Sequence, residues 1–226
     1  MLDRGREVRG RQLKHLQEHD ELDVFELTQK LMLEMGGLDI RLRVPLIDIA
    51  IPALKQLSLS QYKLFKENLT ALIEMDAKID LLEWSLQKII FNHLDGQFFR
   101  LAHTATRYSH AGQLKKEVGL ILSVMAYTGH QDPKEIEAAF NAATKILEFE
   151  GVELRAKNEI SLLDLDRALQ ELEKLTPLTK PRLLKACATS ILHDQKIFPV
   201  EIESLRAFSD AINCPMPPIL LQSSLI

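Results

Sequence analysis

The sequence predicts an all-α protein, and three observations support this prediction. Its composition favours helices, because Leu, Ile, Ala, Glu and Lys dominate whereas Gly and Pro occur only nine times each. In several segments, apolar residues recur at the three- and four-residue spacing of a buried helix face. No segment shows the alternation of apolar and polar residues that is typical of a half-buried strand. We therefore expect about eight or nine helices.

The N-terminal region predicts an irregular start followed by one helix. Residues 1–20 are polar, and a helix is expected from about Glu21 to Met35, before the glycines at 36 and 37 that are typical of a helix end. One face of this helix carries Val24, Leu27, Leu31 and Met35. Further apolar sets with helical spacing lie in 62–73, 82–93 and 114–125, whereas 95–112 lose the pattern and predict a long connection.

Capping signals mark helix starts in the second half of the chain. Asp132 followed by Pro133 is typical of a cap and a first helical residue. Ser161 with Asp164 resembles a second capping pair. Helices are then expected at about 162–175, 180–193 and 199–213, and the prolines that follow end the last one.

An internal repeat is the most informative feature of the sequence. When the chain is compared with itself at an offset of 118 residues, nine positions between Asp48 and Glu83 are identical to their counterparts. The pattern Asp-x-Lys-Ile-x-x-x-Glu occurs in 76–83 and again in 194–201. Such self-similarity indicates a repeated structural unit. We expect duplicated three-helix units with a helical insert between them.

The repeated pattern predicts a corner between two helices. In the first copy Asp80 can cap a helix whose third residue is Glu83, and in the second copy Pro199 suits the first helical position, two residues before Glu201. The preceding aspartates are expected to bind backbone amides in the turn, and the isoleucines to fill the gap between the helices. The residues of this structural motif are Asp76, Ile79, Asp80, Glu83, Asp194, Ile197, Pro199 and Glu201.

The repeat also divides the chain into four predicted segments. Residues 1–43 are the polar N-terminal segment with its helix, and 44–94 are the first repeat. Residues 95–161 are a connecting segment with two helices, and 162–226 are the second repeat with its Pro-rich end. We expect 44–226 to form one compact domain.

Composition narrows the classes of function. The net charge of −4 argues against nucleic-acid binding, for which a basic excess is typical. The charged first ten residues do not resemble a signal peptide, and no apolar run approaches the roughly 20 residues of a membrane helix. Cys187 and Cys214 are expected to be free structural thiols in a reducing compartment. These features predict a soluble, cytoplasmic protein, in which Trp84 is either core or an interaction anchor.

Two segments resemble a known family. "RVPLIDIAIPALKQLSLSQYKLFKENLTALIEMDAKIDLLEWSLQKII" and "LLKACATSILHDQKIFPVEIESLRAFSDAINCPMPPIL" resemble the C-terminal cytoplasmic domain of bacterial HtpX-like membrane zinc metallopeptidases, described as Zn-dependent proteases with chaperone function. That domain resembles the TerB-like helical fold. The resemblance covers about 40–220, and "RGRQL" near the start resembles the segment that follows the membrane helices in that family.

The resemblance implies a binding role for this chain. The family's zinc motif, His-Glu-x-x-His, is absent from the sequence, so the resemblance supplies no catalytic residue and places zinc only in the catalytic part of the family. We expect a non-catalytic, helical regulatory or protein-interaction domain without a cofactor of its own. Its partner would be another protein or the membrane-bound peptidase to which it is accessory.

Two metal-based hypotheses remain as alternatives. His15, Glu18 and His19 form an inverted His-x-x-Glu-His motif that could serve a zinc metallohydrolase, although its charged flanks favour a chance arrangement. TerB-like domains are associated with acidic metal-binding clusters, and the matching positions here are Asp76, Glu83, Asp194 and Glu201. Calcium or magnesium binding there would make a divalent-metal sensor, whereas we favour helix capping and turn bonding.

Overall fold

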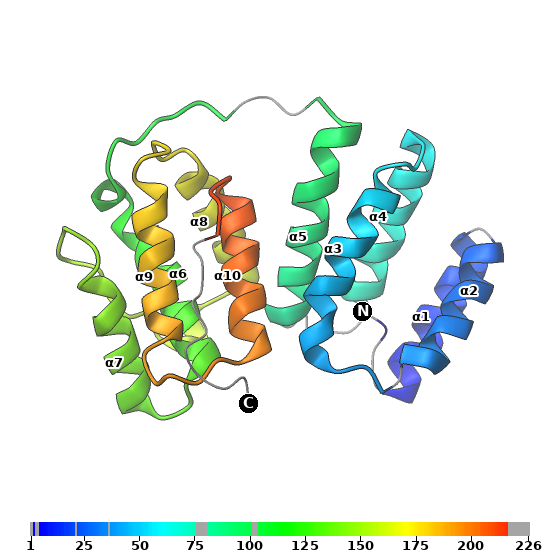
Figure 1. Ribbon diagram of the computed structural model, residues 1–226, viewed down its shortest axis with the longest axis horizontal. Coiled ribbons are helices and arrows are strands. Elements are labelled where there is room, and N and C mark those ends of the chain that lie inside the picture. The colour runs from blue at the N-terminus through cyan, green and yellow to red at the C-terminus, as the bar shows by residue number, and fades with distance from the viewer. Residues whose placement is uncertain are drawn as a thin grey trace. The chain divides into compact units, whose positions relative to one another are not determined.

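The all-α prediction is confirmed by the computed structural model, which describes residues 2, 5–20, 22–35, 37–75, 81–100 and 104–216. Within these ranges the chain forms ten α-helices and three short 3₁₀-helices (Figure 1). They contain no β-sheet, and a single isolated bridge joins Tyr108 to Leu175. Every helix in these ranges is too short or too polar to cross a bilayer.

The chain separates into two compact units, Met1–Leu101 and Ala102–Ile226. This division differs from the prediction that 44–226 form one compact domain. The boundary falls inside the segment 95–161 that was predicted to connect the repeats. The physical reason is that most of that segment is not a connection but the centre of the second unit, as its burial shows below.

The first unit begins with a helix where an irregular segment was predicted. Helix α1 (Arg6–His19) buries Gln12 and Leu16, and Gln12 Nε2 donates a 2.8 Å hydrogen bond to the carbonyl oxygen of Leu72. Only these two of its 14 residues are buried. The sequence therefore lacks the apolar periodicity that would predict this helix. The helix thus depends on tertiary contact with α4 (Leu59–Glu74).

The other helices of this unit are α2 (Leu22–Met35), α3 (Arg43–Leu54) and α5 (Leu81–Phe98), with a 3₁₀ turn η1 (Ile40–Leu42) before α3. Helix α5 packs against both α3 and α4. Ser58 begins α4 with a capping box, in which its hydroxyl accepts from the Gln61 amide and Gln61 Oε1 accepts from the Ser58 amide. The buried core of the unit consists of Tyr62, Leu69, Ile73, Ile90 and Leu94.

The hydroxyl group of Tyr62 is hydrogen-bonded at the edge of this core. The Tyr62 hydroxyl donates a 2.7 Å hydrogen bond to Asp95 Oδ1, and Lys66 Nζ lies 2.6 Å from the same oxygen. Burial, together with the Asp95 carboxylate, raises the pKa of Tyr62 above its usual range. Tyr62 can therefore be fully buried without leaving its hydroxyl unpaired.

The second unit is built around helix α6 (Lys115–Gly129). Nine consecutive residues of α6, from Val118 to Ala126, are buried. Four helices pack against it: α7 (Pro133–Thr144), α8 (Leu162–Glu173), α9 (Lys180–Ile191) and α10 (Pro199–Ala211). Two 3₁₀ turns, η2 (Ala111–Leu114) and η3 (Lys157–Glu159), complete the unit. A helix buried on all sides loses its one-sided pattern, which is why the sequence did not mark α6 as central.

Three predicted helix starts in this unit are confirmed. Asp132 accepts a 2.8 Å hydrogen bond from the Lys134 amide ahead of Pro133. Ser161 accepts from the Asp164 amide at 3.1 Å. Pro199 is the first residue of α10, as predicted. Asp132 and Ser161 each pair an amide that a helix start would leave open, and Pro199 has no amide to pair.

The two predicted repeats each contain three helices with matching starts. The offset of 118 carries the first residue of α5 onto the first residue of α10, and it brings the starts of α3 and α4 within three residues of those of α8 and α9. In each unit the third helix packs against the other two. These agreements fit a duplicated three-helix unit. The duplication and its TerB-like character remain predictions.

Candidate functional site

Helix α2 carries an apolar face that is exposed among the described residues. It packs against α1, and its half-buried residues Phe25, Thr28 and Met32 recur at helical spacing. We assign that face to the contact with α1. A second apolar stripe runs beside it, and four residues form this stripe: Val24, Leu27, Leu31 and Met35.

The structure exposes this stripe to solvent. The exposed fractions of its side chains are 40% for Val24, 55% for Leu27, 41% for Leu31 and 45% for Met35. The sequence correctly predicted that they share one face, but periodicity does not say whether a neighbour covers that face. We call these four residues the α2 stripe.

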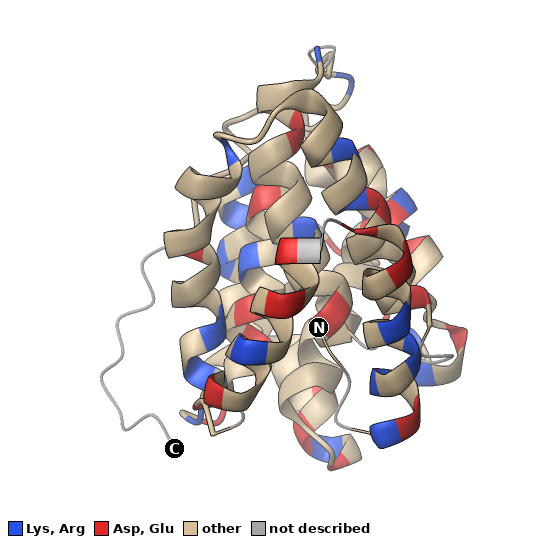
Figure 2. Ribbon diagram, turned by 90° about the vertical axis from the view of Figure 1, so that its right-hand side faces the viewer, with Lys and Arg blue, Asp and Glu red and all other residues tan. Residues whose placement is uncertain are grey.

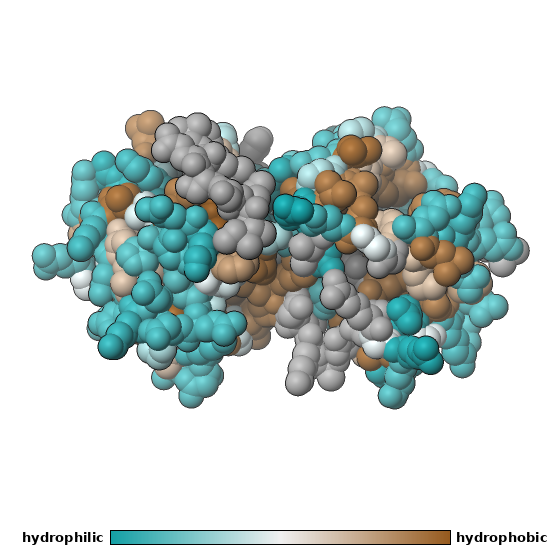
Figure 3. Space-filling model, turned by 60° about the horizontal axis from the view of Figure 1, so that its bottom comes forward, coloured by the Kyte–Doolittle hydropathy of each residue, from teal (hydrophilic) through white to brown (hydrophobic). Residues whose placement is uncertain are grey.

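A second exposed set lies at the start of α3. Leu42, Leu46 and Ile49 are 45%, 37% and 73% exposed, and their spacing places them on one side of the helix. Their four- and three-residue spacing is visible in the sequence, but spacing alone does not indicate that the face is exposed. In Figure 3, apolar patches lie on the surface of the right-hand unit, which contains α1 to α5. Contiguous exposed apolar residues are typical of an interaction surface.

Two carboxylates border the α2 stripe. Asp23 and Glu34 are exposed and, at 100° per residue, lie beside the stripe on the side away from Phe25. They are three turns apart, which is roughly 16 Å along the helix. Lys30 lies in the same row, four residues after Glu26 and four residues before Glu34, so this border carries charges of both signs. Figure 2, which views the molecule from the right-hand side of Figure 1, shows both signs of charge on the helices.

The inverted motif of α1 is engaged in other contacts. The imidazoles of His15 and His19 stack with ring centroids 4.4 Å apart. His15 Nε2 lies 3.0 Å from Asn68 Oδ1, and His19 Nδ1 lies 3.0 Å from the carbonyl oxygen of His15. Glu18 is exposed and pairs with Lys14 at 3.7 Å. The motif therefore lies together on one helix, where its described contacts anchor α1 to α4.

The second copy of the repeated pattern forms the predicted corner. Asp194 Oδ1 accepts a 2.9 Å hydrogen bond from the Lys196 amide, and Ile197 is buried. Glu201 Oε2 accepts a 2.7 Å hydrogen bond from the Phe198 amide, which is the return bond of a capping box. Gln195 adopts a φ of 62°, in the left-handed region that glycine favours. In this copy Asp194 therefore bonds an amide of the turn, and Glu201 bonds an amide at the start of α10.

Part of the first copy lies outside the described residues. Asp76, Ile79 and Asp80 fall in that undescribed stretch, so their predicted roles are untested. Glu83 lies in the first turn of α5, at the position that corresponds to Glu201 in α10.

Burial of Glu201 was not foreseen from the sequence. The residue is 1% exposed, and its Oε1 has no hydrogen-bond partner among the described residues. A Cβ added at Gly129, the last residue of α6, would lie 1.9 Å from that oxygen. Burial raises the pKa of Glu201 to about 7; the Phe198 amide opposes this shift, and the negative charge of Asp194 adds to it.

Histidine side chains lie beside this corner. His130 is 6% exposed, its Nδ1 lies 3.2 Å from the carbonyl oxygen of Ala126, and its Nε2 lies 3.8 Å from Asp194 Oδ2. The ring of His193 has its centroid 6.2 Å from that of His130. Within the described ranges, no three His, Cys, Asp or Glu side chains are arranged to hold a metal ion. The corner therefore brings His130 close to one of the predicted acids, Asp194.

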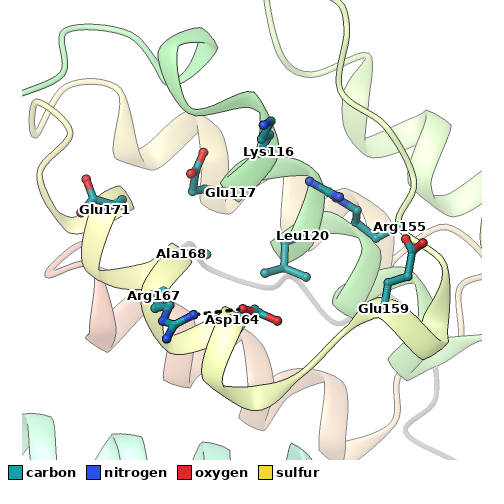
Figure 4. Close-up of a pocket in the computed structure, with 9 residues that line it drawn as sticks. All are labelled: Lys116, Glu117, Leu120, Arg155, Glu159, Asp164, Arg167, Ala168 and Glu171. Carbon is teal, nitrogen blue, oxygen red and sulfur yellow. Dashed lines mark ion pairs between the residues drawn. The ribbon is translucent and has the colours of Figure 1, made fainter.

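Two surface hollows lie in the second unit. The one in Figure 4, about 340 Å³, has Leu120 and Ala168 in its lining together with charged residues of both signs, including an Arg167–Asp164 pair at 3.7 Å. The other, about 550 Å³, is lined by His110 and Phe149 among others. The residues that line the first hollow include no Ser, Cys or His, so they offer neither of these nucleophiles nor a histidine base.

The remaining candidates are structural. Cys187 and Cys214 are buried free thiols, as predicted. Burial raises the pKa of Cys187 to about 12, which suppresses the reactive thiolate. Trp84 is 3% exposed, which decides between the two predicted roles in favour of a buried residue. Tyr108, predicted to lie in a loop, is tied to α8 by a 2.8 Å hydrogen bond to Glu171 Oε2.

No family model matches this chain, and neither the curated proteins nor the solved structures contain a match for it.

Proposed function

We propose that this chain is a non-catalytic helical interaction domain that binds a protein partner through the α2 stripe. The observation that carries the proposal is the exposure of four apolar residues on one face of a helix whose other face is already packed against α1. Exposed apolar area of this kind gains free energy when a partner removes it from water.

The resemblance of residues 40–220 supports a partner class. In that family the helical domain accompanies a membrane-bound zinc metallopeptidase, and we propose that this chain is accessory to such an enzyme. The inverted His-x-x-Glu-His motif gives less support to an enzymatic role, because His15 is hydrogen-bonded to Asn68 and Glu18 is paired with Lys14. A working hydrolase needs an additional metal ligand and an open coordination position.

Site-specific photocrosslinking in the native cells tests the proposal. A crosslinking residue is placed at Leu27, and the matched control is Leu33, which is 81% exposed on the opposite face of the same helix. We expect a discrete product from position 27 that is absent from position 33. Mass spectrometry of the product should identify a protein that contains His-Glu-x-x-His. No product, or the same products from both positions, would contradict the interaction role.

A second measurement tests the non-catalytic character. The purified chain is incubated with an unfolded substrate and zinc, with and without a chelator. We expect no proteolysis in either case. Chelator-sensitive cleavage that disappears in a His15→Ala/His19→Ala variant would establish the hydrolase alternative instead.

A further inference from the structure

The corner between α9 and α10 holds a carboxyl group in a niche where one of its oxygens is unpaired. Glu201 Oε2 accepts the hydrogen bond from the Phe198 amide, whereas Oε1 lies against Gly129 at the end of α6 and has no hydrogen-bond partner among the described residues. An ionised carboxylate in this niche loses hydration that the protein does not replace, and the protonated form loses less. The geometry of the closed corner therefore favours the protonated carboxyl.

Ionisable groups from several parts of the chain surround this niche. Asp194 lies in the turn of the corner, and its negative charge opposes the ionisation of Glu201. His130 follows the last residue of α6, and its buried Nε2 has no hydrogen-bond partner and lies 3.8 Å from Asp194 Oδ2. His193, just after α9, has its ring centroid 6.2 Å from that of His130, and its Nε2 lies 3.9 Å from Glu135 Oε2 of α7.

Basic side chains of the neighbouring helices contact other places. Lys196, in the turn itself, is exposed and gives its backbone amide to Asp194. Lys180 of α9 donates to the carbonyl oxygen of Ile212, beyond the other end of α10, and Glu173 of α8 accepts from the neighbouring Asn213. The repulsion between the two carboxylates of the corner is therefore relieved by a proton, either on Glu201 or on the imidazole beside Asp194.

The turn of the corner also contains a residue in a costly conformation. Gln195 has a φ of 62°, in the left-handed region, where a side chain other than that of glycine is disfavoured. Closing the corner thus requires both a strained backbone at Gln195 and a buried carboxyl at Glu201. Ionisation of that carboxyl adds a cost that opening the corner would remove.

We propose that the corner 194–201 is a pH-dependent hinge, which closes on the end of α6 when Glu201 carries a proton and opens about Gln195 when that carboxyl is ionised. Opening places Glu201 in water and exposes Ile197, which is buried in the closed corner. The hinge does not involve the α2 stripe, so its test is independent of the proposed function.

Linkage between protonation and opening sets the size of the effect. In the closed corner, burial raises the pKa of Glu201 to about 7, and in the open corner the carboxyl returns to its ordinary value of 4.5. The closed state has its full advantage below pH 4.5 and loses it as the pH rises to about 7. Opening should therefore become about tenfold more favourable between about pH 6 and pH 8.

Hydrogen exchange of the full-length chain measures this opening. Mass spectrometry follows peptic fragments that cover 194–202 in buffers with EDTA, and each rate is divided by the intrinsic exchange rate at that pH. We expect the protection of this fragment to fall about tenfold between about pH 6 and pH 8. A fragment that covers 118–126, the buried run of α6, is the internal reference and should stay more protected than the corner at every pH.

Three conservative variants identify the group that titrates. Glu201→Gln keeps an acceptor for the Phe198 amide without a charge, so the protection of its corner should not change with pH. Asp194→Asn removes the charge beside Glu201 and should reduce the fall without abolishing it. The matched control is Glu135→Gln, because this carboxylate lies near the same corner but is 56% exposed, and it should keep the tenfold fall.

Several results would overturn the hinge. One is a corner whose protection does not depend on pH in the parent chain, and another is an unchanged pH dependence in Glu201→Gln. Equal protection of the corner and of 118–126 would also overturn it, because the corner would then open only when the whole unit unfolds. Replacing EDTA with calcium or magnesium should leave the protection unchanged, and a rise would show that the acids hold a metal ion instead of a proton.

Discussion

At the scale of single residues, Glu201 has two opposing effects on the stability of the fold. Its carboxylate accepts a hydrogen bond from the Phe198 amide, which stabilises the start of α10. Burial opposes this gain, because the other oxygen has no hydrogen bond in the described structure and the group is 1% exposed. The raised pKa of about 7 is the measurable result of this balance.

The free energy of unfolding should therefore depend on pH through Glu201. Because the folded-state pKa is raised above the ordinary value of 4.5, this residue binds its proton more readily in the folded state. Its contribution is fully present below pH 4.5, is lost as pH rises to about 7, and is constant above that. At pH 8, Glu201→Gln should be more stable than the parent by about 2–3 kcal/mol.

Urea denaturation of both proteins between pH 4 and pH 8 measures this difference. The comparison with Gln isolates Glu201 from the other titrating groups, because Gln keeps an acceptor for the Phe198 amide without the charge. Parallel stability curves for the two proteins would show that Glu201 titrates normally.

Gly129 is coupled to the same carboxylate. A methyl group at this position would overlap Glu201 Oε1, so the carboxylate would have to move and weaken its bond to Phe198. We expect Gly129→Ala to cost about 1 kcal/mol, the usual value of a helix cap. In a Glu201→Ala background the same change should cost almost nothing. A double-mutant cycle by urea denaturation measures the coupling, and additive effects would rule out the contact.

At the scale of helices, the sequence predicted where helices begin better than it predicted which of their faces are buried. Asp132, Ser161 and Pro199 mark helix starts by chemistry that acts within four residues, and the structure confirms all three. Burial depends on distant helices, which is why α1 was missed and why the central position of α6 was not predicted. For the same reason, the sequence predicted neither the exposure of the α2 stripe nor the burial of Glu201.

The α2 stripe should behave as a binding surface rather than as core. Leu27→Glu should change the free energy of unfolding by less than about 0.5 kcal/mol, because the side chain is already 55% exposed. Leu94→Ala, at a fully buried position of the first unit, should cost about 2–5 kcal/mol. Urea denaturation compares the two variants. A large loss of stability in Leu27→Glu would show that the stripe is covered by the chain itself.

At the scale of the whole molecule, the repeat was a better guide to helix registers than to the domain boundary. Helices α5 and α10 occupy equivalent registers, as the offset of 118 predicted. Each set of three helices instead joins different neighbours, α1 and α2 in the first unit and α6 and α7 in the second. Apolar patterns identify which residues seek burial, but they do not identify the helix that buries them.

The second unit contains its own core, so it should fold without the first. The buried run of α6 is covered by α7, α8, α9 and α10, all within Ala102–Ile226. A fragment of residues 104–216 should therefore keep its helices and melt cooperatively, with a stability within the roughly 5–15 kcal/mol that is common for a domain of this size. Circular dichroism during heating and in urea measures both properties. A fragment that stays helical but melts without cooperativity would show that the core of α6 needs the first unit to complete it.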